Sequence, residues 1–192
     1  MAKGLSAESI TVAAAELIEQ YGRSGFSMRL LADTMGVKTA SLYNHIENMD
    51  TLLTEVCRYA LRMQEDGELR AIAGKTGREA VWALAWAYRR FAQQHRELYW
   101  LGMDTAAGEP RVLDDAAARF TEPLKQGLSG FRLPPREEIH FRRMCRAIVH
   151  GFASQEDEGF FSHYPASTEL SFEFAIQRFI DCVLEAEKRN PS

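Results

Sequence analysis

The chain has 192 residues, of which 46% are hydrophobic and 26% are charged, and its formal net charge is −4 at pH 7. This composition indicates an ordinary globular protein with a sizeable core. The net charge decides neither for nor against a nucleic-acid partner, because a basic patch can lie on an acidic protein.

The sequence lacks the patterns of membrane and secreted proteins. No apolar run approaches the ~20 residues that span a bilayer, and the first residues contain no apolar signal-peptide core. The three cysteines, Cys57, Cys145 and Cys182, are far apart and lie within apolar periodic sequence. This spacing favours reduced, buried thiols over a disulfide framework. We therefore expect a cytoplasmic protein with no membrane partner.

The first part of the chain predicts short helices separated by glycines. Residues 6–21 carry apolar side chains at the spacing of one helical face, and Gly22 ends that pattern. A second helix, 27–35, begins at a serine able to cap it and stops at Gly36. A third short helix is predicted over 38–45.

Longer helices are predicted after these. Asn48 caps a fourth helix, 48–70, which carries an apolar stripe and precedes a glycine-rich loop. Further helical patterns cover residues 78–95, 97–103, 110–128, 136–157 and 167–189. The sequence predicts an all-α fold of about nine helices. Its N-terminal domain is 1–47 and its C-terminal domain is 48–192, in which 48–70 is the connector.

Two short helices around a tight glycine turn match the helix-turn-helix plan, whose second helix enters the major groove of DNA. Leu42 would face the first helix, whereas the polar side chains of the third helix would remain outside. Their hydroxyl, amide and ammonium groups can pair with the donors and acceptors of base edges. The start of the second helix can meet a phosphate.

The run AAELIEQYGRSGFSMRLLADTMGVKTASLYNHIENMDTLL, residues 14–53, closely resembles the DNA-binding domain of the tetracycline-repressor (TetR-type) family of bacterial transcriptional regulators. The matching features are Gly22, Gly25-Phe26-Ser27, Leu31-Ala32, Met35-Gly36-Val37, Leu42-Tyr43-Asn44-His45 and Leu52-Leu53.

This resemblance implies a repressor that binds a (pseudo)palindromic double-stranded DNA operator as a homodimer. The implied DNA-binding residues are Ser27, Met28, Arg29, Lys38, Thr39, Ser41, Tyr43, Asn44 and His45. One position departs from the family pattern. Met49 stands where the family often has a lysine that binds phosphate, which weakens the expected grip on the DNA backbone.

The C-terminal run CRAIVHGFASQEDEGFF, residues 145–161, resembles a His-Gly-Phe-containing subset of TetR-type C-terminal domains. In such proteins the last two long helices pack against their twins in a dimer. The final helix agrees, because it is apolar on two sides and must bury both. The residues expected at the interface are Ile148, Phe152, Phe172, Ile176, Phe179 and Val183. A central core helix of a monomer is the alternative.

The C-terminal domain is also expected to bind a small hydrophobic or aromatic effector that releases the protein from DNA. Ligand pockets are mainly apolar with a few polar anchors. The candidate residues are Trp82, Trp86, Phe91, Tyr99, Trp100, Met103, Phe120, Met144 and His150, each of which could instead belong to the core. We expect no cofactor, no metal site and no catalytic residue.

Two other functions remain open. A helical dimeric adaptor that has lost DNA binding is consistent with Met49 and the low basic charge. An all-α enzyme could use His150 with Glu156 or Asp157 for acid–base chemistry, but it would leave residues 14–53 unexplained.

Overall fold

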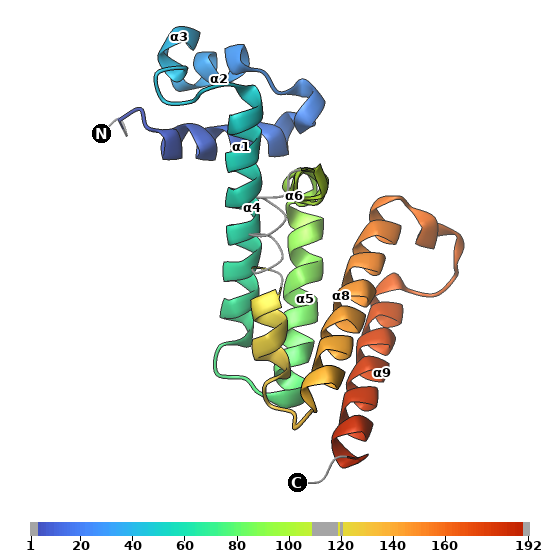
Figure 1. Cartoon of the computed structure of the whole chain (residues 1–192). Coiled ribbons are helices and arrows are strands. Elements are labelled where there is room, and N and C mark those ends of the chain that lie inside the picture. The colour runs from blue at the N-terminus through green and yellow to red at the C-terminus, as the bar shows by residue number, and fades with distance from the viewer. Residues whose placement is uncertain (1–3, 109–118, 120, 190–192) are drawn as a thin grey trace. The chain divides into compact units, whose positions relative to one another are not determined.

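The computed structural model describes residues 4–108, 119 and 121–189, apart from the side chains of 105–108. These residues are helical except for short connections, and they contain no strand. This confirms the predicted all-α fold. The helices are α1 (Ala7–Gly25), α2 (Met28–Met35), α3 (Thr39–Leu42), α4 (Met49–Ile72), α5 (Gly77–Gln94), α6 (Arg96–Gly108), α8 (Pro135–Asp157), the 3-10 helix η1 (Phe160–His163) and α9 (Thr168–Arg189) (Figure 1).

The chain divides into two compact units. The first comprises Met1–Met63 and His95–Ala118, and the second comprises Gln64–Gln94 and Arg119–Ser192. The division falls inside α4, and α6 belongs to the first unit. This packing division differs from the predicted domains 1–47 and 48–192, which remain a functional prediction.

Polar side chains begin the N-terminal helices as the sequence indicates. The Ser6 hydroxyl accepts a hydrogen bond from the Ser9 backbone N–H at 3.1 Å, and the Ser9 hydroxyl accepts from the Ser6 N–H at 2.9 Å. This reciprocal pair satisfies two donors at the start of α1. Gly22 has a φ of 71° and interrupts α1, which confirms the predicted break.

The first unit has a core of aliphatic side chains from α1 to α4 and α6. Burying one of its leucines stabilises the fold by about 1.5–3 kcal/mol. The core includes Ile10, Ala14, Leu17, Ile18, Leu31, Leu42, Leu52, Val56, Leu98 and Leu101. A polar contact adds to it, because a Glu19 carboxylate oxygen accepts a hydrogen bond from the Leu98 backbone N–H at 3.0 Å. Glu19 therefore ties α1 to the first turn of α6.

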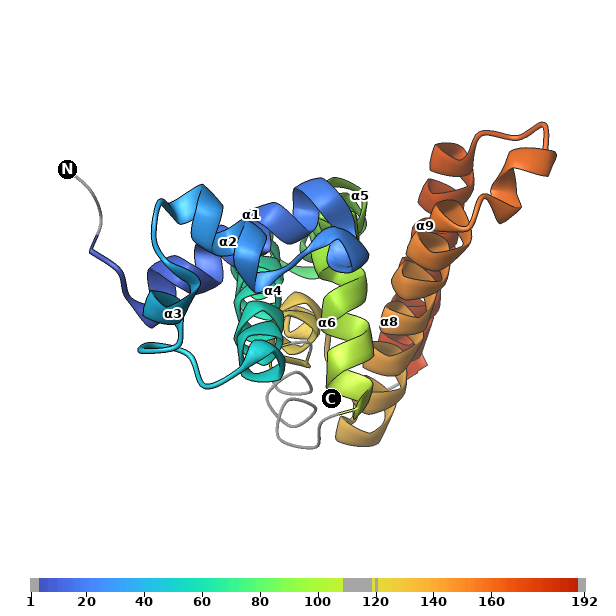
Figure 2. The same cartoon turned by 90° about the horizontal axis from the view of Figure 1, so that it is seen from above.

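In the second unit, α5 packs against both α8 and α9. Figures 1 and 2 show α8 and α9 side by side, joined by the turn that contains η1. Arg89 of α5 is buried and binds the carboxylate of Glu156 on α8 through two guanidinium nitrogens. The Arg89 guanidinium also lies 4.8 Å from the centre of the Phe172 ring on α9. One cation thus links all three helices.

The cysteines correct one expectation. Cys57 and Cys145 are buried as predicted, but Cys182 is exposed. Its position in α9 lies on the side that faces away from the unit's own core, which periodicity alone does not reveal.

Candidate nucleic-acid interface and effector pocket

The turn between α2 and α3 is built by hydrogen bonds and one glycine. The Ser27 hydroxyl accepts from the Leu30 backbone N–H at 3.1 Å and begins α2. Gly36 ends α2 with a φ of 68°, in the left-handed region that favours glycine. The Val37 N–H then donates to the Ala32 carbonyl at 3.0 Å, which closes the turn.

The two helices bury their apolar side chains and leave polar ones exposed. Leu31 of α2 and Leu42 of α3 are fully buried in the core of the first unit. Lys38, Asn44 and His45 are exposed, Tyr43 is 49% exposed, and Thr39 and Ser41 are partly exposed. These six side chains supply a cation, hydroxyls, an amide and an imidazole on one short surface segment.

The helix α3 is shorter than predicted. It covers Thr39–Leu42 rather than 38–45, and residues 43–45 form a turn. The N–H groups of His45 and Ile46 both donate to the Leu42 carbonyl, at 2.9 and 3.1 Å. The buried Ile46 side chain directs the chain back to the core, which ends the helix after Leu42.

The start of α2 presents two of the three predicted residues. Ser27 is exposed, and the Arg29 side chain is 89% exposed with its Nε 3.9 Å from an Asp33 oxygen. Met28 differs, because it is only 7% exposed and packs in the core. Its inclusion among the DNA-binding residues is therefore corrected: Met28 anchors α2 from inside.

Beside α3, the first turn of α4 carries no cation. The Asn48 side-chain oxygen accepts from the Thr51 backbone N–H at 2.9 Å, which confirms Asn48 as the cap. Met49 is partly buried and packs against the core. Between residues 27 and 48 the lysines and arginines are Arg29 and Lys38 alone, so the surface is polar rather than strongly basic.

The predicted effector residues are distributed over both units. Trp82, Trp86 and Phe91 lie in α5, Met144 and His150 in α8, and Tyr99, Trp100 and Met103 in α6 of the first unit. Phe120 lies outside the described residues. Several are committed to packing: Trp86 stacks edge-on against Phe172, and the buried Tyr99 ring lies 5.2 Å from Trp100.

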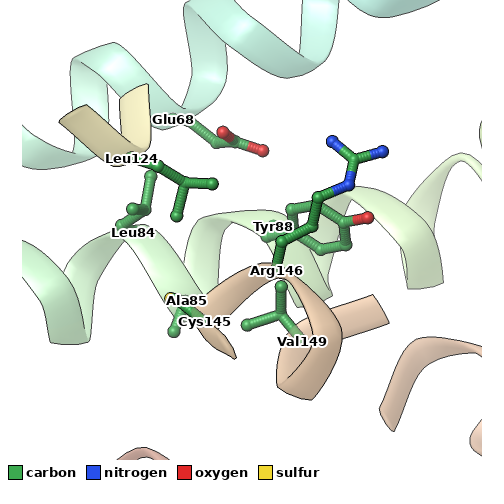
Figure 3. Close-up of a pocket in the computed structure, with 8 residues that line it drawn as sticks. All are labelled: Glu68, Leu84, Ala85, Tyr88, Leu124, Cys145, Arg146 and Val149. Atoms are coloured by element: carbon green, nitrogen blue, oxygen red, sulfur yellow. The ribbon is translucent and has the colours of Figure 1, made fainter. Parts of the chain in front are cut away.

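A narrow pocket in the second unit has a different lining, none of which belongs to that predicted set. Its walls come from α4, α5, residues 121–128 and α8, and its cavity volume is about 10 Å³, which is room for about one water molecule. Figure 3 shows the Glu68 carboxyl facing into it, with the Tyr88 ring and the Arg146 side chain on the opposite side. Sequence reasoning missed Glu68. The spacing of residues in the fourth helix could have indicated that Glu68 is buried, because Leu61, Gln64 and Glu68 continue the apolar stripe of that helix.

A second, more open pocket lies where α8, η1 and α9 meet. Its lining includes Phe152, Phe161 and Tyr164. Phe152 was predicted at the dimer interface; in the structure it is partly exposed and stacks on Phe172 with ring centres 5.2 Å apart.

Four of the predicted interface residues face inward. Phe172, Ile176, Phe179 and Val183 are fully buried within the chain itself. They cannot contact a second copy, because α5 and α8 already cover them. Ile148 remains partly exposed. The apolar residues on the open side of α9 are instead Leu170 and Phe174, which are 64% and 66% exposed.

One of the two carboxylates of the enzyme alternative is engaged elsewhere. Glu156 binds Arg89 and also accepts a hydrogen bond from the Gln93 amide at 3.3 Å. Burial lowers the pKa of His150, and Arg146 lowers it further. Among the described residues, no three His, Cys, Asp or Glu side chains are grouped to hold a metal ion. None of the described helices is long and apolar enough to cross a membrane.

Comparison with known proteins identifies the family. Residues 10–56 match the family described as bacterial regulatory proteins, tetR family, and residues 81–179 match the tetracyclin repressor-like C-terminal domain. The chain belongs to the TetR family of transcriptional regulators. Assignment to the His-Gly-Phe-containing subset remains a prediction.

Relatives of similar length support this assignment. The uncharacterized HTH-type transcriptional regulator YobS of Bacillus subtilis is 28% identical over 183 residues, which cover 94% of each chain. A protein of unknown function from Rhodococcus sp. RHA1 has the same fold, with a TM-score of 0.79, 22% identity and coverage of 94% of this chain and 96% of that one. The TetR-family protein ActR of Streptomyces coelicolor, solved in complex with (S)-DNPA, has a TM-score of 0.63, 20% identity and coverage of 95% and 98%.

Proposed function

We propose that this TetR-family regulator is a repressor that binds a (pseudo)palindromic operator as a homodimer and is released by a small effector. The observation that carries the proposal is the polar surface of α3 and the following turn. Leu42 and Ile46 hold this segment to the core, while Lys38, Asn44 and Tyr43 project to solvent.

The exposed groups suit different parts of DNA. Lys38, Thr39, Ser41 and Asn44 offer donors and acceptors to base edges, which is how sequence is read in the major groove. Other contacts go to phosphates and fix position without reading sequence. Ser27, Arg29, Tyr43 and His45 suit that role, because they flank the readout residues at the start of α2 and the end of α3.

The outer sides of α8 and α9 support a homodimer. Leu170 and Phe174 are four residues apart, so they lie on one side of α9, and Ile139 and Met144 of α8 are also exposed. At Gly151 of α8 an added Cβ would meet no atom within 4 Å, which leaves room for a second helix to approach. An obligate interface is more apolar than ordinary surface, and these residues meet that requirement. In the proposed interface, these exposed residues take the place of the buried Phe172, Ile176, Phe179 and Val183.

A matched pair of tyrosine variants tests DNA binding. Tyr43 and Tyr21 are 49% and 51% exposed, but Tyr21 lies in α1, away from the α2–α3 turn in sequence. Tyr43→Ala should weaken binding to the DNA upstream of the protein's own gene and to unrelated DNA alike, whereas Tyr21→Ala should not. Equal titration curves for the two variants in a gel-shift experiment would refute the role of Tyr43.

The low number of cations favours a second candidate, a dimeric adaptor without DNA binding. Arg29 and Lys38 are few for a protein that must hold a polyanion. The two candidates differ in one readout, because an adaptor shows no preference among DNA sequences at any salt concentration.

A further inference from the structure

The more open pocket, at the turn between α8 and α9, has aromatic walls. Figures 1 and 2 show this turn, which contains η1, at the end of the two paired helices. The cavity volume is about 260 Å³. An enclosed cavity of about 150 Å³ is enough to hold a benzene molecule, so this space admits a small organic molecule. The lining residues are Phe152, Phe161, Tyr164, Ala166, Thr168 and Ser171.

Two of the aromatic rings are held in place by packing. The rings of Phe152 and Phe161 have centres 5.3 Å apart and planes inclined at 49°, so they form an open corner. Phe152 also packs edge-on against Phe172, with ring centres 5.2 Å apart, and Phe172 is fully buried. Tyr164, which is 68% exposed, adds a third ring. The corner is therefore formed before a ligand binds, which lowers the entropic cost of binding.

The chain around the pocket is acidic. Residues 147–177 contain five Asp or Glu residues and no Lys or Arg. Glu158, Glu169 and Glu173 pair with no lysine or arginine within the described part of the chain. Each of these acids is close in sequence to a lining residue. The surroundings therefore favour a positively charged ligand over an anion.

One cation of the chain itself approaches the aromatic cluster from α5. The Arg89 guanidinium lies 4.8 Å from the centre of the Phe172 ring. It is paired with Glu156, so it adds little net positive charge. His163 of η1 is exposed and lies outside the lining. Neither group removes the preference for a cation.

The lining itself selects the kind of cation. None of its six side chains carries a formal charge at neutral pH. A primary ammonium group would lose water here without gaining a carboxylate partner, which costs free energy. A quaternary ammonium group has no N–H to satisfy, and aromatic faces are its usual partners in proteins. The hydroxyls of Tyr164, Thr168 and Ser171 make no hydrogen bond with any described residue, so they are available to a polar group elsewhere on the ligand.

We propose that this pocket binds a small quaternary ammonium compound, whose cationic head lies against the rings of Phe152, Phe161 and Tyr164. Aromatic faces carry negative partial charge and attract such a cation, and the carboxylates nearby add a screened attraction. The site is separate from the narrow pocket beside Glu68, with which it shares no lining residue. The inference goes beyond the proposed function and holds whether or not α3 binds DNA.

Three probes of nearly the same shape separate the effect of charge from that of apolar contact. Choline, 3,3-dimethylbutan-1-ol and 3,3-dimethylbutanoate carry positive, zero and negative charge. Ligand-observed NMR titration of the full-length protein should show choline binding roughly 2- to 30-fold more tightly than the alcohol, which is the gain expected of a cation over aromatic rings. The butanoate should bind most weakly. The choline methyl resonance should move upfield on binding, because ring currents shield protons that lie above a ring face.

A double variant and a matched control place the binding at this corner. Phe161→Leu combined with Tyr164→Leu removes two rings but keeps apolar side chains, so the affinity for choline should fall to near that for the alcohol. Phe160→Leu alters the neighbouring ring of η1, which is 53% exposed and outside the lining, and should retain the preference for choline.

Several results would overturn the proposal. They are equal binding of choline and the alcohol, a preference for the butanoate, and no binding of any probe. A preference for choline that survives in the double variant, or that disappears in Phe160→Leu, would place the cation elsewhere. The upfield shift is measured on the unaltered protein, so its absence refutes the proposal even if the double variant misfolds.

Discussion

The missing cation at the start of α4 gives a quantitative prediction. Met49 follows the Asn48 cap directly and packs only partly against the core. If α3 enters the major groove, the first turn of α4 lies near the phosphate backbone, where related proteins often carry a lysine. Met49→Lys should therefore add one phosphate contact per protomer.

The magnitude follows from counterion release. Each phosphate contact contributes about −0.9 to the slope of log affinity against log salt concentration. On an unrelated duplex Lys38 has no matching base edge to read, so Lys38 and Arg29 are both counted as phosphate contacts. A dimer then makes four such contacts and has a slope of about −3.6. Met49→Lys raises the number to six and the slope to about −5.4. Between 50 and 200 mM salt the loss of affinity then grows from about 150-fold to about 1,800-fold.

Fluorescence anisotropy with a labelled duplex measures the salt slope of the unaltered protein and of Met49→Lys. A duplex of unrelated sequence can be used, because phosphate contacts carry no sequence information. The cost in stability is small: a cation at a helix N-terminus costs about 0.3–1 kcal/mol. Met49→Gln, which changes packing without adding charge, is the control. A folded Met49→Lys protein with an unchanged salt slope would refute the docking of α3 beside a phosphate backbone.

Three further predictions follow from single positions. Gly36→Ala should destabilise the first unit by about 1–2 kcal/mol, because the φ of this residue is 68°. No atom lies within 4 Å of an added Cβ, so the cost is backbone strain alone. An unchanged midpoint of urea unfolding would contradict this. Phe174→Glu should convert dimers to monomers, as measured by light scattering after gel filtration. Tyr21→Glu, at a position of similar exposure, should leave the dimer intact. If the Phe174→Glu protein is still a dimer, the outer side of α9 is not part of the interface. Glu68 binds a proton more tightly folded than unfolded, so the stability of the native protein should fall as pH rises from about 4.5 to about 8. Glu68→Gln should remove that part of the fall in pH-dependent chemical denaturation, and parallel curves for the two proteins would show that Glu68 does not titrate in this range.

The DNA-binding part of the fold could be predicted from the sequence because local signals decide it. Ser27 and Asn48 cap their helices through their own side chains, and Gly36 adopts the left-handed turn expected of it. Each signal acts within four residues. The sequence overestimates the length of α3 because the end of this helix depends on Ile46 reaching a core made by other helices.

The C-terminal part is harder to predict, because periodicity shows that a side of a helix is buried but not what buries it. Phe172 and Phe179 are expected against a second copy, yet they pack against the chain's own α5 and α8. Aromatic character alone suggests effector residues, but Trp86 and Tyr99 serve in packing instead. Glu68 is missed because a charged residue on an apolar stripe reads as a solvated one until its burial is seen.

The central claim is that the polar surface of α3 reads a DNA sequence, and a competition experiment tests it most directly. The DNA upstream of the protein's own gene is footprinted, and the protected duplex then competes with a scrambled duplex of equal length at physiological salt. We expect a protected site with two half-sites and a preference of about 1,000-fold or more for it. Equal affinity for the two duplexes would contradict the claim.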